Sequence, residues 1–288
     1  MFFDFKNQVA IVTGAGGGLG RSYALALAAR GASVVINDLN NAQAVVEEII
    51  KNGGKAIANN GNVASIEDMQ KMAAQAIDAY GRIDILVNNA GILRDKSFAK
   101  MQLEDFKAVM DVHLMGSVNA SKAVLATMQD QQYGRIIMIS SSSGLYGNFG
   151  QSNYGAAKMG VVGLMNTFKL EFKKYNIHVN TVVPIAATQM TENLMPEEAL
   201  KILNPDLVSP AIVYLSAKEA PNGEIISAGG GSFARARIVE SEALYLGNDA
   251  SGEMIAENWS KITDPLGEKS IASGPEHSLK FISKALSS

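Results

Sequence analysis

A tyrosine and a lysine stand four residues apart in the segment NYGAAKMG, at Tyr154 and Lys158. This spacing places both side chains on one face of a helix. A phenol beside an ammonium can give and take a proton, which is acid/base chemistry. The spacing alone is weak evidence, because Tyr214 and Lys218 repeat it. The residues around Tyr154 are small, which suits either a reaction face or close helix packing.

The composition narrows the chemistry that this pair could serve. The chain has 288 residues, a net charge of −3 and no cysteine, so thiolate nucleophiles and disulfides are excluded. Its three histidines, His113, His178 and His277, lie far apart in the sequence, which argues against a metal site. The charge balance gives no broad basic field for nucleic acid or an anionic membrane. We therefore expect a small-molecule substrate, no metal, and neither nucleic acid nor membrane as a partner.

No targeting segment is evident. The N-terminal MFFDFKNQVAIVTG lacks the basic region and long apolar run of a secretory signal, and the C-terminal KALSS is not the Ser-Lys-Leu peroxisomal address. No apolar stretch reaches the roughly 18 residues that a membrane span needs. We expect a soluble protein of the cytoplasm.

Short β-branched runs alternate with alanine-rich amphipathic stretches through the first 235 residues. The runs that indicate strands are residues 9–13, 33–37, 55–58, 83–88, 134–140, 177–184 and 223–228. The alternation predicts an α/β fold, a Rossmann-type doubly wound parallel sheet of about seven strands. Residues 236–288 show helical patterns only, which predicts a mainly helical C-terminal extension packed on a core domain of residues 1–235.

A glycine cluster follows the first predicted strand, in TGAGGGLGRS. Gly14, Gly18 and Gly20 would let the backbone approach a pyrophosphate, whose charge the N-terminus of the next helix would hold. A tight strand-to-helix turn also favours glycine, so this cluster alone leaves both interpretations open.

Asp38, at the end of the second predicted strand, bears on the choice of dinucleotide. Its carboxylate can accept hydrogen bonds from the adenosine ribose hydroxyls and would repel a 2′-phosphate. No lysine or arginine lies in residues 13–20 or 38–48 to neutralise such a phosphate. The pattern favours NAD over NADP, although an aspartate here could also cap a helix or lie in a solvated loop.

With TGxxxGxG, NNAG at residues 88–91 and the Tyr154–Lys158 pair in this order, residues 7–232 resemble the short-chain dehydrogenase/reductase family. In that family a serine lies some thirteen residues before the tyrosine, which identifies Ser141 in ISSSSG. Lys201 stands at that distance before Tyr214, so the second pair indicates ordinary helix surface. The resemblance implies that Ser141 binds the substrate oxygen and Tyr154 is the acid/base. Lys158 would lower the pKa of Tyr154 and hold the nicotinamide ribose.

The resemblance also implies a set of cofactor-binding residues. These are Gly14, Gly18, Leu19, Gly20, Asp38, Asn62, Val63, Asn89, Ala90, Gly91, Tyr154, Lys158, Pro184 and Thr188. Two departures stand out. His113 occupies a position where many members have an asparagine that supports a proton-relay water, so it could serve the relay or simply pack. The segment PIAA, residues 184–187, replaces the Pro-Gly or Pro-Asn-Ala-Gly of other members.

A narrower resemblance is to the (3R)-hydroxyacyl-CoA dehydrogenase unit of peroxisomal type 2 multifunctional enzymes. The segments NNAGILRDKSFAKM, VHLMGS, MTENLMPEE and ENWSKITD carry it. It implies an NAD-dependent enzyme that interconverts (3R)-3-hydroxyacyl-CoA and 3-oxoacyl-CoA, assembled as a homodimer or a tetramer. The alternatives are a 3-oxoacyl-acyl-carrier-protein reductase, a hydroxysteroid dehydrogenase, or a non-catalytic cofactor-binding regulatory protein. The intact set of Ser141, Tyr154 and Lys158 argues against the last.

Overall fold

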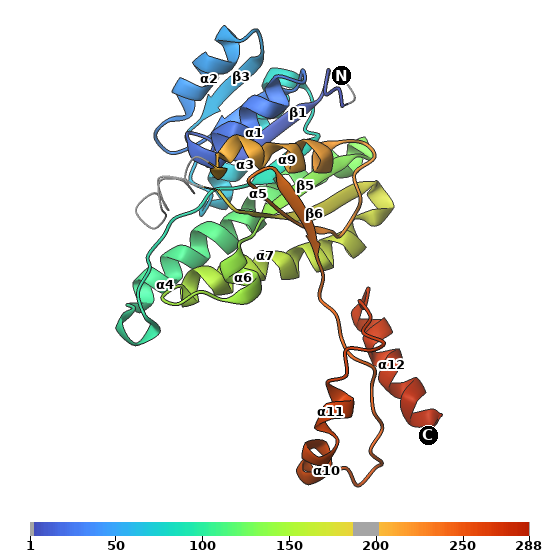
Figure 1. Cartoon of the computed structure of the whole chain (residues 1–288). Coiled ribbons are helices and arrows are strands. Elements are labelled where there is room, and N and C mark those ends of the chain that lie inside the picture. Colours follow the sequence, from blue (N-terminus) through green and yellow to red (C-terminus); the bar gives the residue numbers. More distant parts are fainter. Residues whose placement is uncertain (1–2, 187–201, 288) are drawn as a thin grey trace. The chain divides into compact units, whose positions relative to one another are not determined.

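The computed structural model describes residues 3–186 and 202–287. The first compact unit, Met1–Arg235, contains one eight-stranded sheet with the strand order β3-β2-β1-β4-β5-β6-β7-β8 (Figure 1). The strands are β1 (Val9–Thr13), β2 (Ser33–Asn37), β3 (Lys55–Asn59), β4 (Ile85–Asn88), β5 (Gly134–Ile139), β6 (Ile177–Pro184), β7 (Ile225–Gly229) and β8 (Ser232–Ala236). Every neighbouring pair from β3 to β7 is parallel. The chain winds outward in both directions from the central β1–β4 pair.

Helices cover the sheet in two layers (Figure 1). The main ones are α1 (Gly18–Ala28), α2 (Ala42–Lys51), α3 (Ile66–Tyr80), α4 (Leu103–Met110), α5 (Gly116–Gln131), α6 (Ser142–Tyr146), α7 (Ser152–Glu171) and α9 (Ser209–Ser216). Helix α1 packs against α2 and α9, whereas α3 packs against α5 and α4 against α7. Single turns occur at η1 (Phe98–Lys100), η3 (Lys173–Tyr175) and η5 (Pro205–Leu207), and η2 (Asp111–Met115) is a π-helical turn between α4 and α5.

The central strands are buried on both faces, as a parallel sheet between two helical layers requires. All five residues of β1 and all six of β5 are buried. The predicted Rossmann-type doubly wound fold is confirmed, and β1, β2 and β6 begin and end at the predicted residues. The prediction of about seven strands missed β8, whose residues are almost all exposed and therefore lack an apolar pattern.

The topology places five chain segments at one edge of the sheet. Gly14 follows β1, Asp38 follows β2, Asn89 follows β4, Ser140 follows β5 and Ile185 follows β6. Because these strands are parallel, their carboxyl ends meet at this edge. The reversal of strand order between β1 and β4 opens a crevice there, which is where open α/β sheets bind ligands.

The second compact unit comprises residues 236–288 and contains α10 (Gly252–Glu257), α11 (Trp259–Ile262) and α12 (Gly274–Leu286). A single antiparallel bridge joins Glu240 to Lys269. None of its described residues is buried, so this segment has no core of its own. Its packing on the first unit stays a prediction. Across residues 3–186 and 202–287, no helix is long and apolar enough to cross a membrane.

The core of the first unit should set its stability. Ile36 of β2 is fully buried in the main apolar cluster, so Ile36→Ala is expected to lower the free energy of unfolding by about 2–5 kcal/mol. Ile50 on α2 is 55% exposed, and Ile50→Ala should change it by less than about 1 kcal/mol. Urea unfolding of the two variants measures the difference, and equal losses would contradict this assignment of the core.

Candidate active site

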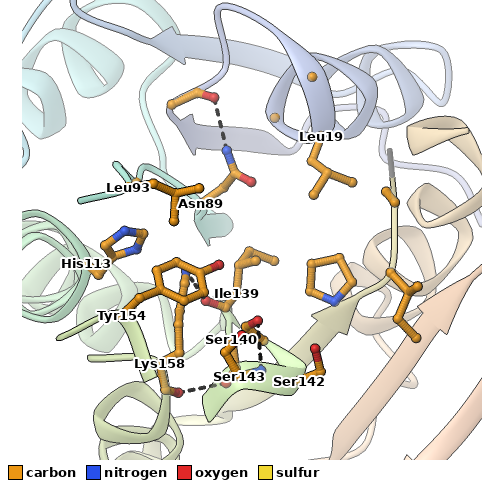
Figure 2. A pocket seen from close by; sticks show the side chains of 18 of the residues that line it. Leu19, Asn89, Leu93, His113, Ile139, Ser140, Ser142, Ser143, Tyr154 and Lys158 are labelled. Carbon is orange, nitrogen blue, oxygen red and sulfur yellow. Dashed lines mark hydrogen bonds between the residues drawn. The ribbon is translucent and has the colours of Figure 1, made fainter. Parts of the chain in front are cut away.

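One cavity of about 570 Å³ occupies the crevice at the carboxyl edge of the sheet. Its walls extend from the glycine turn after β1 and Asp38, past Asn89, to the residues that follow β5 and β6. Tyr154, Lys158 and His113 lie in its wall (Figure 2). Ser141 also lines it. The structure thus brings the predicted acid/base group and the predicted cofactor residues of the glycine turn into one continuous space. Its volume falls in the range of small-molecule and cofactor sites.

The glycine turn is held at close range by the segment after β4. Asn89 Nδ2 donates to the carbonyl oxygens of Thr13 and Gly14, each at 3.0 Å. Thr13 Oγ1 accepts from the backbone N–H groups of Asn89 (3.0 Å) and Ala90 (3.1 Å). A Cβ added to Gly20 would lie 2.2 Å from the Gly14 carbonyl oxygen. The NNAG motif therefore fixes the shape of the turn that a dinucleotide pyrophosphate would approach.

This turn fits a bound anion. Helix α1 begins at Gly18 with no side-chain cap and no acidic residue in its first turn, so its first N–H groups are not occupied by a side chain. A Cβ added to Gly17 would meet nothing within 4 Å, which leaves open space in front of the helix N-terminus. Aligned N–H groups and the helix dipole favour a phosphate there.

Asp38 forms the far end of the cavity. Its Oδ2 accepts from the backbone N–H of Gly16 at 3.1 Å, and its Oδ1 accepts from the N–H groups of Asn40 (3.0 Å) and Asn41 (3.1 Å). The carboxylate thus caps the turn before α2 and also faces the cavity. The capping interpretation thus describes this residue, and its recognition of a ribose stays a prediction.

Some predicted cofactor residues lie elsewhere. Asn62 and Val63 are not in the cavity wall: the Asn62 N–H donates to Asp68 Oδ2 at 3.0 Å, and the Val63 carbonyl accepts from Asn119 at 2.9 Å. Ala90 holds Thr13 through its backbone rather than lining the cavity. Thr188 lies outside the described residues. Among the described residues, no group of three or more His, Cys, Asp or Glu could hold a metal ion.

Ser141 is the N-cap of α6 and lies opposite Tyr154 in the cavity. Its Oγ accepts from the Ser143 N–H at 3.2 Å. This bond occupies a lone pair of Ser141 and leaves its hydroxyl proton free to be donated. A hydrogen bond between the Ser141 and Tyr154 side chains lowers the pKa of the phenol.

Lys158 is buried, with only 4% of its surface exposed, and its Nζ donates to the Ile139 carbonyl at 2.7 Å. The Ser140 hydroxyl donates in turn to the Lys158 carbonyl at 2.7 Å, so two bonds tie α7 to the end of β5 (Figure 2). The Lys158 Nζ lies 5.5 Å from the centroid of the Tyr154 ring. Burial lowers the pKa of Lys158 to about 7.

That Lys158 lowers the pKa of Tyr154 stays a prediction of the resemblance. Burial of the phenol raises its pKa above the ordinary value, and this effect outweighs the opposing hydrogen bond from Ser141. Burial in the same wall lowers the pKa of Lys158, so the neutral form of each group is favoured there.

His113 lies in the π-helical turn η2, between α4 and the cavity. Its Nε2 lies 3.0 Å from the Ile92 backbone nitrogen and 2.8 Å from the Ile92 oxygen, so the tautomer decides which of the two it contacts as acceptor or donor. The ring meets Tyr154 edge to face, with centroids 5.1 Å apart at 87°. Burial, aided by Lys158, lowers the pKa of His113 to about 3. The lowered pKa favours a neutral imidazole, and the ring contact shows that His113 packs against Tyr154.

Close packing explains the small residues around the pair. A Cβ on Gly144 of α6 would lie 2.9 Å from the Lys158 backbone, and a Cβ on Gly155 would lie 3.0 Å from the Ser143 oxygen. Larger residues would push α6 away from α7 and separate Ser141 from Tyr154. Sequence reasoning missed other cavity residues, among them Leu93, Asn148 and Gln151. Its position three residues before Tyr154 was the sequence signal that could have identified Gln151 as a cavity residue.

The fold and the cavity define a dinucleotide-dependent oxidoreductase site, with a phosphate-binding turn at one end and a serine, a tyrosine and a lysine at the other. The sequence matches the short chain dehydrogenase family over residues 8–199, and the chain belongs to that family. It is therefore a dehydrogenase/reductase that acts on hydroxyl or oxo groups.

Two curated relatives illustrate the range of the family. The chain is 46% identical over 274 residues to peroxisomal multifunctional enzyme A of Dictyostelium discoideum, covering 91% of this chain and 61% of the relative. It is 45% identical over 223 residues to the 3-oxoacyl-[acyl-carrier-protein] reductase of Synechocystis, covering 74% of this chain and 90% of the relative. The chain thus spans less than two thirds of the multifunctional relative's length.

Two solved structures resemble the chain over most of its length. Full-length peroxisomal multifunctional enzyme type 2 of Drosophila melanogaster has a TM-score of 0.84 and 38% identity, over 97% of this chain and 49% of that one. A 7α-hydroxysteroid dehydrogenase, solved with NADH and 7-oxo glycochenodeoxycholic acid, has a TM-score of 0.74 and 30% identity, over 79% and 95%.

Gly91 offers a test of the His113–Tyr154 contact. A Cβ at Gly91 would lie 2.2 Å from His113 Cε1, so Gly91→Ala should displace the ring that supports Tyr154. We expect kcat to fall by about 10- to 100-fold, the loss that a displacement of about 1 Å can cause. Gly163→Ala on α7 is the control, because its Cβ would meet nothing within 4 Å. Steady-state kinetics measure both, and a wild-type kcat for Gly91→Ala would refute the contact's importance.

Proposed function

We propose that this protein is an NAD-dependent dehydrogenase that interconverts (3R)-3-hydroxyacyl-CoA and 3-oxoacyl-CoA. The observation that carries the proposal is the single cavity joining the glycine turn and Asp38 to Ser141, Tyr154 and Lys158. The arrangement puts a hydrogen-bond donor and a proton-transfer group side by side, next to a place for a dinucleotide.

The chain's own groups suffice to handle the substrate oxygen. The Ser141 hydroxyl, which accepts from the Ser143 N–H and bonds Tyr154 in the chain by itself, can donate its proton to this oxygen instead. The Tyr154 phenol is the acid/base that gives the proton to the oxygen or takes it away. Lys158, whose Nζ donates to the Ile139 carbonyl, lies beside the phenol in the cavity wall and would hold the nicotinamide ribose. A bound nicotinamide would supply or accept the hydride.

The acyl-CoA substrate is supported by how much of the chain the comparisons cover. The matches to the multifunctional enzymes cover 91% and 97% of the chain and so must include most of residues 236–288. The match to the acyl-carrier-protein reductase covers 74%, which leaves out more residues than that segment contains. The extension is therefore shared with the multifunctional enzymes. Leu93, Ile185 and Ala186 give the cavity an apolar side that suits an acyl chain.

NAD rather than NADP is the cofactor that the charges favour. Asp38 faces the cavity with its carboxylate. The nearest arginine in sequence to the glycine turn, Arg21, is paired with Glu48. A 2′-phosphate would therefore meet the negative charge of Asp38, while Arg21 is already paired with Glu48.

A panel of thioesters tests the substrate. We expect the protein to reduce NAD with (3R)-3-hydroxyacyl-CoA and not with the (3S) epimers, followed by absorbance of the reduced cofactor. Tyr154→Phe should lower kcat by about 100-fold or more because the proton-transfer group is lost. Tyr214→Phe, from the second pair with the same spacing, is the matched control and should retain wild-type turnover.

Other outcomes of this panel would overturn the proposal. Turnover of the (3S) thioesters alone would refute the stereochemistry. Turnover of only an acyl-carrier-protein thioester or only a steroid alcohol would assign the chain to one of the other activities in the family. NADH binding without turnover of any of these compounds would indicate a cofactor-binding regulatory protein.

Asp38 tests the cofactor choice. The wild-type protein should show a higher kcat/KM with NAD than with NADP. Asp38→Asn keeps an oxygen acceptor for the backbone N–H groups but removes the charge, and should lower the NAD-to-NADP ratio by about tenfold, or roughly 1.4 kcal/mol. Glu47→Gln on the exposed face of α2 serves as the charge control. An unchanged NAD-to-NADP ratio of kcat/KM in Asp38→Asn would show that the carboxylate does not recognise the adenosine ribose.

The cytoplasmic location and the assembly as a homodimer or a tetramer stay predictions of the sequence.

A further inference from the structure

Gln151 lies where the two helices that carry the site begin. It is the N-cap residue of α7, which bears Tyr154 and Lys158, and its side chain reaches the first turn of α6. Its Oε1 accepts from Ser143 Oγ at 2.7 Å and from Asn148 Nδ2 at 3.0 Å. The Gln151 side chain therefore bridges the start of α7 to the start of α6, and it also lines the cavity.

The other end of this amide is held by a carboxylate. Gln151 Nε2 donates to Asp95 Oδ2 at 2.6 Å. A carboxylate accepts but cannot donate, so this bond fixes which end of the Gln151 amide faces Ser143. An amide without such a partner could rotate and present its NH₂ group to Ser143 instead.

The segment that carries Asp95 is itself anchored to α7. The Arg94 carbonyl accepts from Asn153 Nδ2 at 3.0 Å, and the Lys96 N–H donates to the Gly150 carbonyl at 2.9 Å. Asn153 is fully buried. These two bonds lie on either side of Asp95 and hold its carboxylate opposite Gln151.

The hydrogen bonds of Gln151 lead through Ser143 to Ser141, the residue proposed to bind the substrate oxygen. Ser143 uses its hydroxyl for Gln151 and its backbone N–H for Ser141 Oγ, at 3.2 Å. Moving Ser143 would therefore move the donor that orients the Ser141 hydroxyl. A chain of hydrogen bonds leads from Asp95 through Gln151 and Ser143 to Ser141.

We propose that Gln151, oriented by Asp95, is a positioning residue that sets Ser141 against Tyr154 for proton transfer to and from the substrate oxygen. The inference rests on the proposed dehydrogenase function of this site. Gln151 acts through Ser143 and Ser141, and Asp95 acts through Gln151 and through its charge.

The electrostatic environment of Tyr154 gives the pair a measurable signature. The groups that face the phenol are Lys158 from α7, His113 from η2, Ser141 at the start of α6 and, at longer range, Asp95. The negative charge of Asp95 raises the pKa of Tyr154, whereas His113 is neutral above about pH 3. Removing that charge should lower the pKa of the phenol.

Two variants separate the effect of the Asp95 charge from the effect of the Gln151 hydrogen bonds. Asp95→Asn removes the charge but keeps an oxygen that can accept from Gln151, so kcat should fall less than in the Gln151 variant, while the acid limb of kcat/KM for alcohol oxidation shifts to lower pH by about half a unit. Gln151→Met keeps the side-chain length but removes all three side-chain hydrogen bonds, to Ser143, Asn148 and Asp95, and should lower kcat by about tenfold with the KM for NAD unchanged. Asp130→Asn, an exposed carboxylate at the C-terminal end of α5, is the control and should change neither quantity.

The proposal is overturned if Gln151→Met keeps the wild-type kcat, or if Asp95→Asn and wild type share one pH profile. If Gln151→Met does not fold, the pH profile of Asp95→Asn decides. If the wild-type protein turns over none of the thioesters, the proposed function fails, and a different readout tests this inference. The ultraviolet absorbance of the Tyr154 phenolate, obtained by subtracting Tyr154→Phe, should then titrate at lower pH in Asp95→Asn, and coincident curves would refute it.

Discussion

The buried ammonium of Lys158 is the constraint on which the arrangement of the site depends. An ammonium removed from water is unfavourable unless hydrogen bonds compensate for its lost hydration. Within the described chain Lys158 donates to one backbone oxygen, that of Ile139, and burial lowers its pKa to about 7. The fold must therefore hold the end of β5 and the middle of α7 in a fixed relation. The Ser140 hydroxyl on the Lys158 carbonyl supplies the second bond.

In this site glycine is needed for the close packing of neighbouring segments more than for backbone flexibility. At Gly20, Gly91 and Gly144, an added Cβ would meet an atom at less than 3 Å: the Gly14 oxygen, the His113 ring and the Lys158 backbone, respectively. Each contact joins two segments that follow the same strand: β1 for Gly14 and Gly20, β4 for Gly91 and His113, and β5 for Gly144 and Lys158. Close approach at a glycine therefore shapes three parts of the site: the turn after β1, the contact of His113 with the NNAG segment, and the packing of α6 on α7.

The sequence predicted the fold well because the strands are buried on both faces. Runs rich in β-branched residues, such as VAIVT and IHVNTVVP, mark β1 and β6 to the residue, whereas exposed β8 has no such pattern. The site was predictable where a motif is local, as with Tyr154 and Lys158. It was not predictable where it depends on how a loop folds back: Asp95 and Gln151 meet across 56 residues.

Burial explains the remaining difference between sequence and structure. The sequence shows that a lysine lies four residues after Tyr154, and charge alone then predicts a lowered phenol pKa. The structure places the phenol and the lysine in the same poorly solvated wall, where each neutral form is favoured, so the pKa of Tyr154 rises and that of Lys158 falls. At neutral pH the resting site therefore holds a protonated phenol, which is ready to donate a proton to a carbonyl. Taking a proton from an alcohol requires additional positive charge beside the phenol, so the direction of transfer depends on the charge of what binds next to Lys158.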